Sequence, residues 1–183
     1  MYGEPESSVF YRRKIISDIL NQVYDQQRIA ETKHAGLLAL NAVLLAGIWQ
    51  MGFKMSITSP YTDVIIFANI ALIISIGISL VSFKPNLKAT PVTGNMSNTQ
   101  PSPIMSYLAA SRYCNGKEYL ETLSRKLMTE RDGEDYDNEL ASQIVHNSKI
   151  ALNKFTKFRY AIYLNLLGIV LVIVSLIINA APV

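Results

Sequence analysis

Three long apolar runs dominate the pattern of hydrophobic and polar positions along this chain of 183 residues. Residues 35–53, 64–83 and 161–178 contain no charged side chain. About 20 mainly apolar residues in helical geometry are enough to cross the hydrocarbon core of a bilayer. We therefore predict an all-α membrane protein with three transmembrane helices.

The segment before the first run has the pattern of an amphipathic helix. Apolar side chains recur three and four positions apart between polar ones, and Ser7 or Ser8 can cap the helix. Neither Gly nor Pro separates it from the first run, so one continuous helix is predicted from about residue 8 to about residue 52. The alternative is a helix on the membrane surface, with Arg12, Arg13 and Lys14 against lipid phosphates.

The segment between the second and third runs is mixed. Residues 84–103 read as a linker, and residues 104–128 as two helices separated at Asn115 and Gly116. After the acidic turn 131–138, Asp135 or Asp137 can cap a last helix that continues into the third run. We expect this helix and the N-terminal helix to extend into the cytoplasm and to pack side by side there.

The basic residues predict the orientation. Of 17 Lys and Arg, five precede the first run, one follows it, and eleven lie between residues 84 and 159. The positive-inside rule then places the N-terminus and the long middle segment in the cytoplasm. The predicted segments are a cytoplasmic helix 1–33, spans 34–53, 63–83 and 160–179, an external loop 54–62, a cytoplasmic helical region 84–159 and an external tail 180–183.

Composition adds little beyond this. The formal net charge of +3 is ordinary for the cytoplasmic flanks of membrane helices, so no nucleic-acid partner is expected. The chain has no GxSxG, GxxxxGK[ST], HExxH or GxGxxG sequence, and Cys114, His34 and His146 lack partners at ligand spacing. We predict neither an enzyme nor a metal site nor a cofactor.

Each of the three apolar runs carries one asparagine: Asn41, Asn69 and Asn165. An amide in hydrocarbon seeks a hydrogen-bond partner on a neighbouring helix. Counted from the cytoplasmic ends, Asn41 and Asn165 lie at similar depth and can pair, whereas Asn69 lies toward the outside. Ordinary packing of one bundle is the favoured interpretation, and a water or ion path lined by the asparagines is the alternative.

Two segments resemble a known family. ETKHAGLLALNAVLL, with Glu31, Lys33, Leu37 and Asn41, is similar to the D-x-K-A-x-x-L-L-x-x-N signature of the transmembrane effectors of Pycsar, the bacterial pyrimidine cyclase system against phage. Glu31 replaces the Asp of that signature, and His34 is an addition. ELASQIVHNSKIALNKF resembles the family's approach to its last span through Leu140, Gln143, Asn147, Ser148, Ala151 and Lys154. Phe83, Pro85, Glu118 and Tyr119 also fit.

The resemblance implies an effector in the bacterial inner membrane that senses cyclic UMP or cyclic CMP from a partner cyclase. Binding would impair the membrane and arrest the infected cell, and disruption by a three-span protein would need a homo-oligomer. The nucleotide bears one negative charge, so cationic and amide side chains are the candidate ligands, with tyrosines for stacking. The candidates are Lys33, Arg112, Lys117, Arg125, Asn147, Lys149 and Lys154, with Tyr107, Tyr113 and Tyr119.

Two other classes of function stay open from the sequence. A constitutive membrane toxin of holin type would damage membranes without any nucleotide. A membrane scaffold would recruit a protein through its cytoplasmic helices and leave permeability unchanged.

Overall fold

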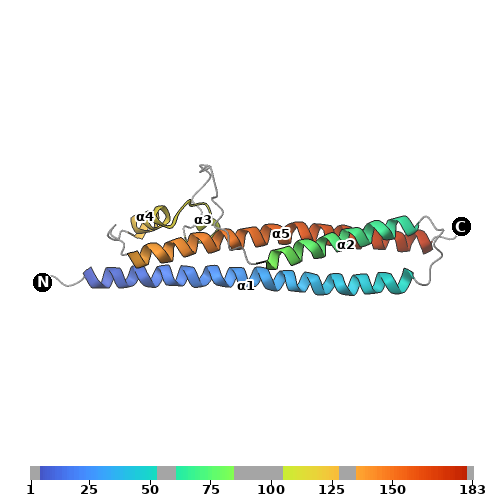
Figure 1. The fold of residues 1–183 in the computed structure, drawn as a ribbon, viewed down its shortest axis with the longest axis horizontal. Helices are drawn as coiled ribbons and strands as arrows, with labels where there is room; N and C mark the ends of the chain where they lie inside the picture. Colours follow the sequence, from blue (N-terminus) through green and yellow to red (C-terminus); the bar gives the residue numbers. More distant parts are fainter. Residues whose placement is uncertain (1–4, 53–60, 85–104, 128–134, 181–183) are drawn as a thin grey trace. The chain divides into compact units, whose positions relative to one another are not determined.

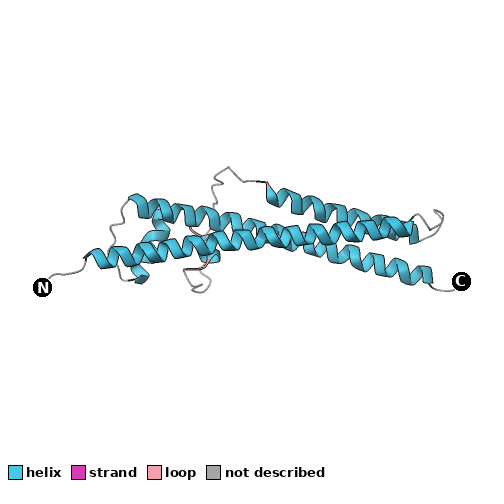
Figure 2. Ribbon diagram, turned by 90° about the horizontal axis from the view of Figure 1, so that it is seen from below, coloured by secondary structure: helices cyan, strands magenta, loops and turns pink. Residues whose placement is uncertain are grey.

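The computed structural model describes residues 5–52, 61–84, 105–127 and 135–180, and every regular element among them is a helix (Figure 2). The helices are α1 (Pro5–Gly52), α2 (Tyr61–Phe83), α3 (Tyr107–Ala110), α4 (Gly116–Leu127) and α5 (Asp135–Ala180), as Figure 1 shows. The all-α prediction is therefore confirmed. Most of the predicted external loop, the linker and the first part of the acidic turn lie outside the described residues.

Three of these helices, α1, α2 and α5, are long and apolar enough to cross a membrane. The predicted continuity of the first and last helices is confirmed, since α1 has 48 residues and α5 has 46 without a break. The start of α1 differs from the prediction. The helix begins at Pro5, whose fixed φ suits a first turn, so Ser7 and Ser8 lie inside the helix and do not cap it.

The chain divides into two compact units. Unit 1 comprises residues 1–29 and 86–153, and unit 2 comprises residues 30–85 and 154–183. Helices α1 and α5 contribute a segment to each unit, whereas α3 and α4 belong to unit 1 and α2 belongs to unit 2.

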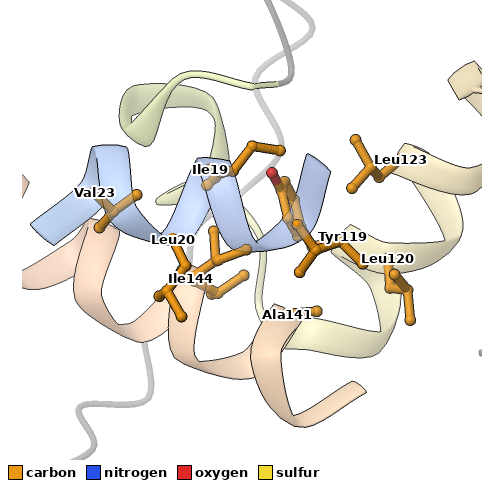
Figure 3. Packing of buried hydrophobic residues seen from close by; sticks show 11 residues of the cluster. Ile19, Leu20, Val23, Tyr119, Leu120, Leu123, Ala141 and Ile144 are labelled. Carbon is orange, nitrogen blue, oxygen red and sulfur yellow. The ribbon is translucent and has the colours of Figure 1, made fainter. Parts of the chain in front are cut away.

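Unit 1 has an apolar core formed by four helices (Figure 3). Helix α1 contributes Ile16, Ile19, Leu20 and Val23, α3 contributes Ala110, α4 contributes Tyr119, Leu120 and Leu123, and α5 contributes Ala141, Ile144 and Val145. These residues recur three or four apart, so each helix turns one apolar face inward. The expected side-by-side packing of the first and last helices is present within this unit.

Local hydrogen bonds fix the short helices of unit 1. The Ser106 hydroxyl accepts from the Ala109 amide at 3.2 Å and caps α3, and the Asn115 side chain accepts from the Glu118 amide at 2.8 Å and caps α4. The predicted break at Asn115 and Gly116 is therefore confirmed. A Cβ at Gly116 would overlap the backbone of Ser142, so this glycine allows α4 to begin directly against α5.

Unit 2 contains segments of α1, α2 and α5 with the opposite distribution of side chains. Its large apolar side chains point outward, as expected of helices in lipid. Examples on the three helices are Leu40, Val43, Phe67, Ile73, Leu80, Val170 and Ile173, all exposed. Its interior holds Asn41, Ser75, Ser79 and Asn165 beside small and aliphatic residues.

Candidate functional site

A buried ion pair joins α1 to the first turn of α5 in unit 1. The Arg12 guanidinium donates to Asp137 Oδ2 through Nη2 at 2.6 Å and through Nε at 3.2 Å, and Arg13 Nε donates to Asp137 Oδ1 at 3.3 Å. Arg12 is 2% exposed and Asp137 is fully buried. Asp137 therefore binds arginines from within the first turn of α5 instead of capping the helix, and the burial of Arg12 does not fit the alternative in which it lies against lipid phosphates.

Four of the predicted ligand residues gather around the start of α4. Arg112 and Tyr113 lie directly before this helix, and Lys117 lies in its first turn. Lys149 of α5 joins them, because its ammonium group donates to the Cys114 carbonyl oxygen at 3.5 Å. The first turn of α4 also carries Glu118, so the local charge is mixed and not purely basic.

The other polar candidates of unit 1 lie apart from this group. Arg125 is exposed in the last turn of α4, about 12 Å along the helix axis from Lys117 at 1.5 Å per residue. Asn147 is held by α1, since Gln27 Nε2 donates to its backbone oxygen at 2.9 Å and to its side-chain oxygen at 3.1 Å. The Gln27 contact makes Asn147 part of the packing between α1 and α5.

The tyrosine candidates have different environments. Tyr119 is fully buried in the core of unit 1, where burial and the neighbouring Tyr113 raise the pKa of its hydroxyl. The Tyr113 ring packs against it edge to face, with centroids 5.2 Å apart. Tyr107 and Tyr113 remain partly exposed at the edge of that core. Of these three rings, only Tyr119 is enclosed in this arrangement and closed to a ligand.

Lys33 and Lys154 belong to unit 2, where each has a local partner. Lys33 Nζ lies 5.3 Å from the Phe155 ring centroid and 5.9 Å from that of Phe158, within cation–π range. Lys154 forms an ion pair with Glu31. Glu31 of the first family-like segment and Lys154 of the second therefore meet between α1 and α5.

Two of the three asparagines form a hydrogen-bond network across unit 2. Asn165 Nδ2 donates to Asn41 Oδ1 at 2.5 Å, Asn41 Nδ2 donates to Ser75 Oγ at 3.2 Å, and Ser75 Oγ donates to the Ala161 carbonyl at 2.8 Å. The network connects α1, α2 and α5 at the depth expected for Asn41 and Asn165. Asn69 bonds instead to the Ile65 carbonyl of its own helix, at 2.9 Å.

Sequence reasoning missed two members of unit 2. Ser75 is not among the polar residues singled out from the sequence, although its hydroxyl connects α2 to both neighbouring helices. His34 is 1% exposed and lies between the Phe83 and Phe158 rings, with Nε2 3.1 Å from the Lys154 carbonyl oxygen. The sequence signal for His34 was its position at the start of the first apolar run, directly after Lys33.

Metal chemistry finds no support in the described part of the chain. No group of three or more His, Cys, Asp or Glu side chains there is placed to hold an ion. The ion pairs Arg12–Asp137 and Glu31–Lys154 and the Asn41–Asn165 hydrogen bond instead connect helices to one another.

These features together define an all-α membrane protein with three helices able to span a bilayer and a packed helical unit outside the apolar segments. Comparison with protein families identifies the chain further. Residues 15–179 match the family described as the Pycsar effector protein domain, which is nearly the whole chain. The chain belongs to this family of membrane effectors, and it is an antiphage defence effector of transmembrane character.

Two further comparisons gave no match. Neither the curated proteins nor the solved structures contain a significantly similar chain.

Proposed function

We propose that unit 1 binds cyclic UMP or cyclic CMP and that binding makes the protein impair the bacterial inner membrane. Membership of the Pycsar effector family is the observation that carries this proposal. A partner cyclase would supply the nucleotide, the N-terminus and unit 1 would lie in the cytoplasm, and the active form would be a homo-oligomer.

The start of α4 is the part of unit 1 best suited to the nucleotide. Arg112, Lys117 and Lys149 bring three cations to this place, and Tyr113 offers a partly exposed ring to a base. Lys149 is bound there to a neutral carbonyl, whereas a phosphate oxygen forms a stronger charge-assisted hydrogen bond. A cyclic phosphate can therefore take Lys149 from Cys114 and shift α5 relative to the start of α4.

Helices α1 and α5 supply the connection between binding and the membrane. Each is a continuous helix that contributes residues to both units. A change in their packing within unit 1 is thus passed along helix backbone into unit 2. Such a change requires that the nucleotide bind one arrangement of the helices more tightly than the other.

Binding is tested by titrating labelled cyclic UMP and cyclic CMP into the detergent-purified protein, with cyclic AMP and a cyclic dinucleotide as controls. We expect selective pyrimidine binding that weakens about tenfold or more in Lys149→Gln, the effect of losing one charge-assisted contact. Lys126→Gln is the matched control, because Lys126 is exposed in the last turn of α4. Equal affinity of both variants would contradict the placement of the site.

Measuring the permeability of vesicles that contain the protein distinguishes the proposed effector from a constitutive toxin and from a scaffold. A toxin releases a dye from vesicles without nucleotide, and a scaffold releases none under any condition. The proposed effector releases dye only with a cyclic pyrimidine nucleotide.

A further inference from the structure

Unit 2 is polar on the inside, and hydrogen bonding between its helices accounts for only part of that polarity. Its buried polar side chains come from all three helices: His34, Asn41, Ser75, Ser79, Ser82, Asn165 and Ser175. The network of Asn41, Ser75 and Asn165 is explained as a set of interhelical hydrogen bonds. The other four need a separate explanation.

Several buried polar atoms of unit 2 have no protein partner. Within the described residues, the hydroxyl oxygens of Ser79, Ser82 and Ser175 and the Nδ1 atom of His34 accept or donate no hydrogen bond. A buried hydroxyl without a partner costs about 1–3 kcal/mol, whereas alanine of nearly the same size would cost nothing of this kind. Inside a membrane bundle, a buried ionisable side chain such as His34 marks a water-filled cavity or an ion pathway, and the unpartnered serine hydroxyls share that interior with it.

The serines of α2 form one continuous polar face. Ser75, Ser79 and Ser82 are four and three residues apart, all are buried, and Ser82 directly precedes Phe83, which contacts His34. The polar face therefore runs from the His34 end of unit 2 to the level of Asn41 and Asn165. Leu80, next to Ser79 and about 100° around the helix from it, is 56% exposed on the outer surface of the bundle.

An apolar layer interrupts this face beyond the asparagines. Leu72 is fully buried, and a Cβ added to Gly168 would lie 2.9 Å from its side chain and 3.4 Å from the Ala68 carbonyl oxygen. Helices α2 and α5 thus pack closely at this level because residue 168 is glycine. An apolar constriction of this kind closes a polar path by excluding water.

We propose that the polar inner faces of α1, α2 and α5 line the path by which water and small ions cross the membrane, with Leu72 packed on Gly168 as its closed gate. This inference rests on the proposed function, since activation has to separate α2 from α5 at the gate. The separated faces form the wall of the path in a homo-oligomer, and the apolar outer faces stay in lipid. Water and ions then supply the hydrogen bonds that Ser79, Ser82 and His34 lack.

Cysteine accessibility tests the lining of the path. The sequence has one cysteine, so Cys114→Ser gives a background in which single cysteines can be placed. In this background Ser79→Cys and Leu80→Cys are compared in vesicles, since the two adjacent positions of α2 lie at about the same depth, Ser79 buried inside the bundle and Leu80 exposed on its outer surface. After activation by cyclic UMP or cyclic CMP, an impermeant cationic thiol reagent should react with Ser79→Cys and cause a loss of ion flux. Leu80→Cys should retain its flux.

The gate is tested separately by substitution of glycine. Gly168→Val places a branched side chain against Leu72 and should produce ion flux without nucleotide. Gly77→Val is the matched control, because no atom lies within 4 Å of a Cβ at that position of α2. Flux that stays nucleotide-dependent in the folded Gly168→Val protein would overturn the gate.

The outcomes distinguish this inference from the proposed function. Nucleotide-dependent flux that the reagent leaves unchanged in Ser79→Cys would overturn the path and leave the proposed function standing. Absence of nucleotide-dependent flux in the folded wild-type protein would overturn the proposed function, and the path with it. Loss of flux in Ser79→Cys but not in Leu80→Cys supports both.

Discussion

Unit 1 and unit 2 are built from the same two long helices with opposite distributions of polarity. In unit 1 the apolar side chains of α1 and α5 point inward against α4, and its buried charges, Arg12 and Asp137, neutralise each other. In unit 2 most large apolar side chains point outward, and the interior holds Asn41, Ser75 and Asn165 beside a few buried aliphatic residues such as Leu72. Unit 1 is therefore stabilised by its apolar core, as in a protein surrounded by water, whereas unit 2 depends on lipid outside and hydrogen bonds inside.

The largest expected effect comes from breaking the buried ion pair of unit 1. Asp137→Ala leaves the Arg12 guanidinium buried without its carboxylate, and the free energy of opening of unit 1 should fall by about 3–5 kcal/mol. Amide hydrogen exchange of the first turns of α5 measures this change. Glu31→Ala is the control, since Glu31 is 47% exposed and its pair with Lys154 should contribute about 0–1 kcal/mol. An equal loss of stability in Asp137→Ala and Glu31→Ala would contradict the contrast between a buried and an exposed ion pair.

Truncation of apolar side chains sharpens the comparison. Leu123→Ala removes a fully buried side chain from the core of unit 1 and should lower its free energy of opening by about 2–5 kcal/mol. Ile73→Ala, 58% exposed on α2, should cost much less because no cavity forms among protein atoms. Both are measured by hydrogen exchange in detergent, and a larger cost for Ile73→Ala would show that unit 2 has an apolar core after all.

The polar interior of unit 2 should yield a smaller effect. Asn165→Ala leaves Asn41 Oδ1 without its donor and should weaken the bundle by about 0.6–2 kcal/mol. A double-mutant cycle with Asn41→Ala measures the coupling, which should exceed about 0.5 kcal/mol for residues in contact. Asn69→Ala should show no coupling to Asn165→Ala, since its hydrogen bond stays within α2. Additive costs for Asn41→Ala and Asn165→Ala would contradict the network.

The smallest effect is a change of stability with pH. Burial raises the pKa of Tyr119 above its ordinary value of about 10, so the folded state favours the protonated hydroxyl. Unit 1 should therefore keep its full stability below pH of about 10 and lose stability as the pH rises from there toward the folded-state pKa. Hydrogen exchange between neutral and alkaline pH measures the slope, and Tyr119→Phe should reduce it. Tyr136→Phe, at an exposed position of α5, should not.

The sequence was sufficient for the helices and for one contact of the bundle. Uninterrupted apolar runs and the absence of Gly and Pro before them predicted the continuous α1 and α5. Counting residues from the cytoplasmic ends predicted that Asn41 and Asn165 lie at one depth, where they do form a hydrogen bond. Both predictions depend on helical periodicity, which is a local property of the sequence.

Helical periodicity does not predict which residues far apart in the sequence pair in the fold. Arg12 and Asp137 are 125 positions apart, and each has an ordinary local role, as a lipid anchor or as a helix cap, that tertiary packing overrides. Tyr119 appeared as a stacking ring because a buried and an exposed tyrosine look alike in an amphipathic helix. The residues that would bind the nucleotide remain a prediction, since the sequence identifies only the types of side chain suited to the task, cationic, amide and aromatic, and not which of them form the site.

In the proposed mechanism, a cyclic pyrimidine nucleotide bound by unit 1 opens the polar interior of unit 2. Ion flux is therefore measured from vesicles that contain the wild-type protein, without nucleotide and with cyclic UMP, cyclic CMP or cyclic AMP. We expect flux with a cyclic pyrimidine nucleotide and none with cyclic AMP or without nucleotide. Flux of equal size in all four conditions would show that the nucleotide does not open the membrane unit.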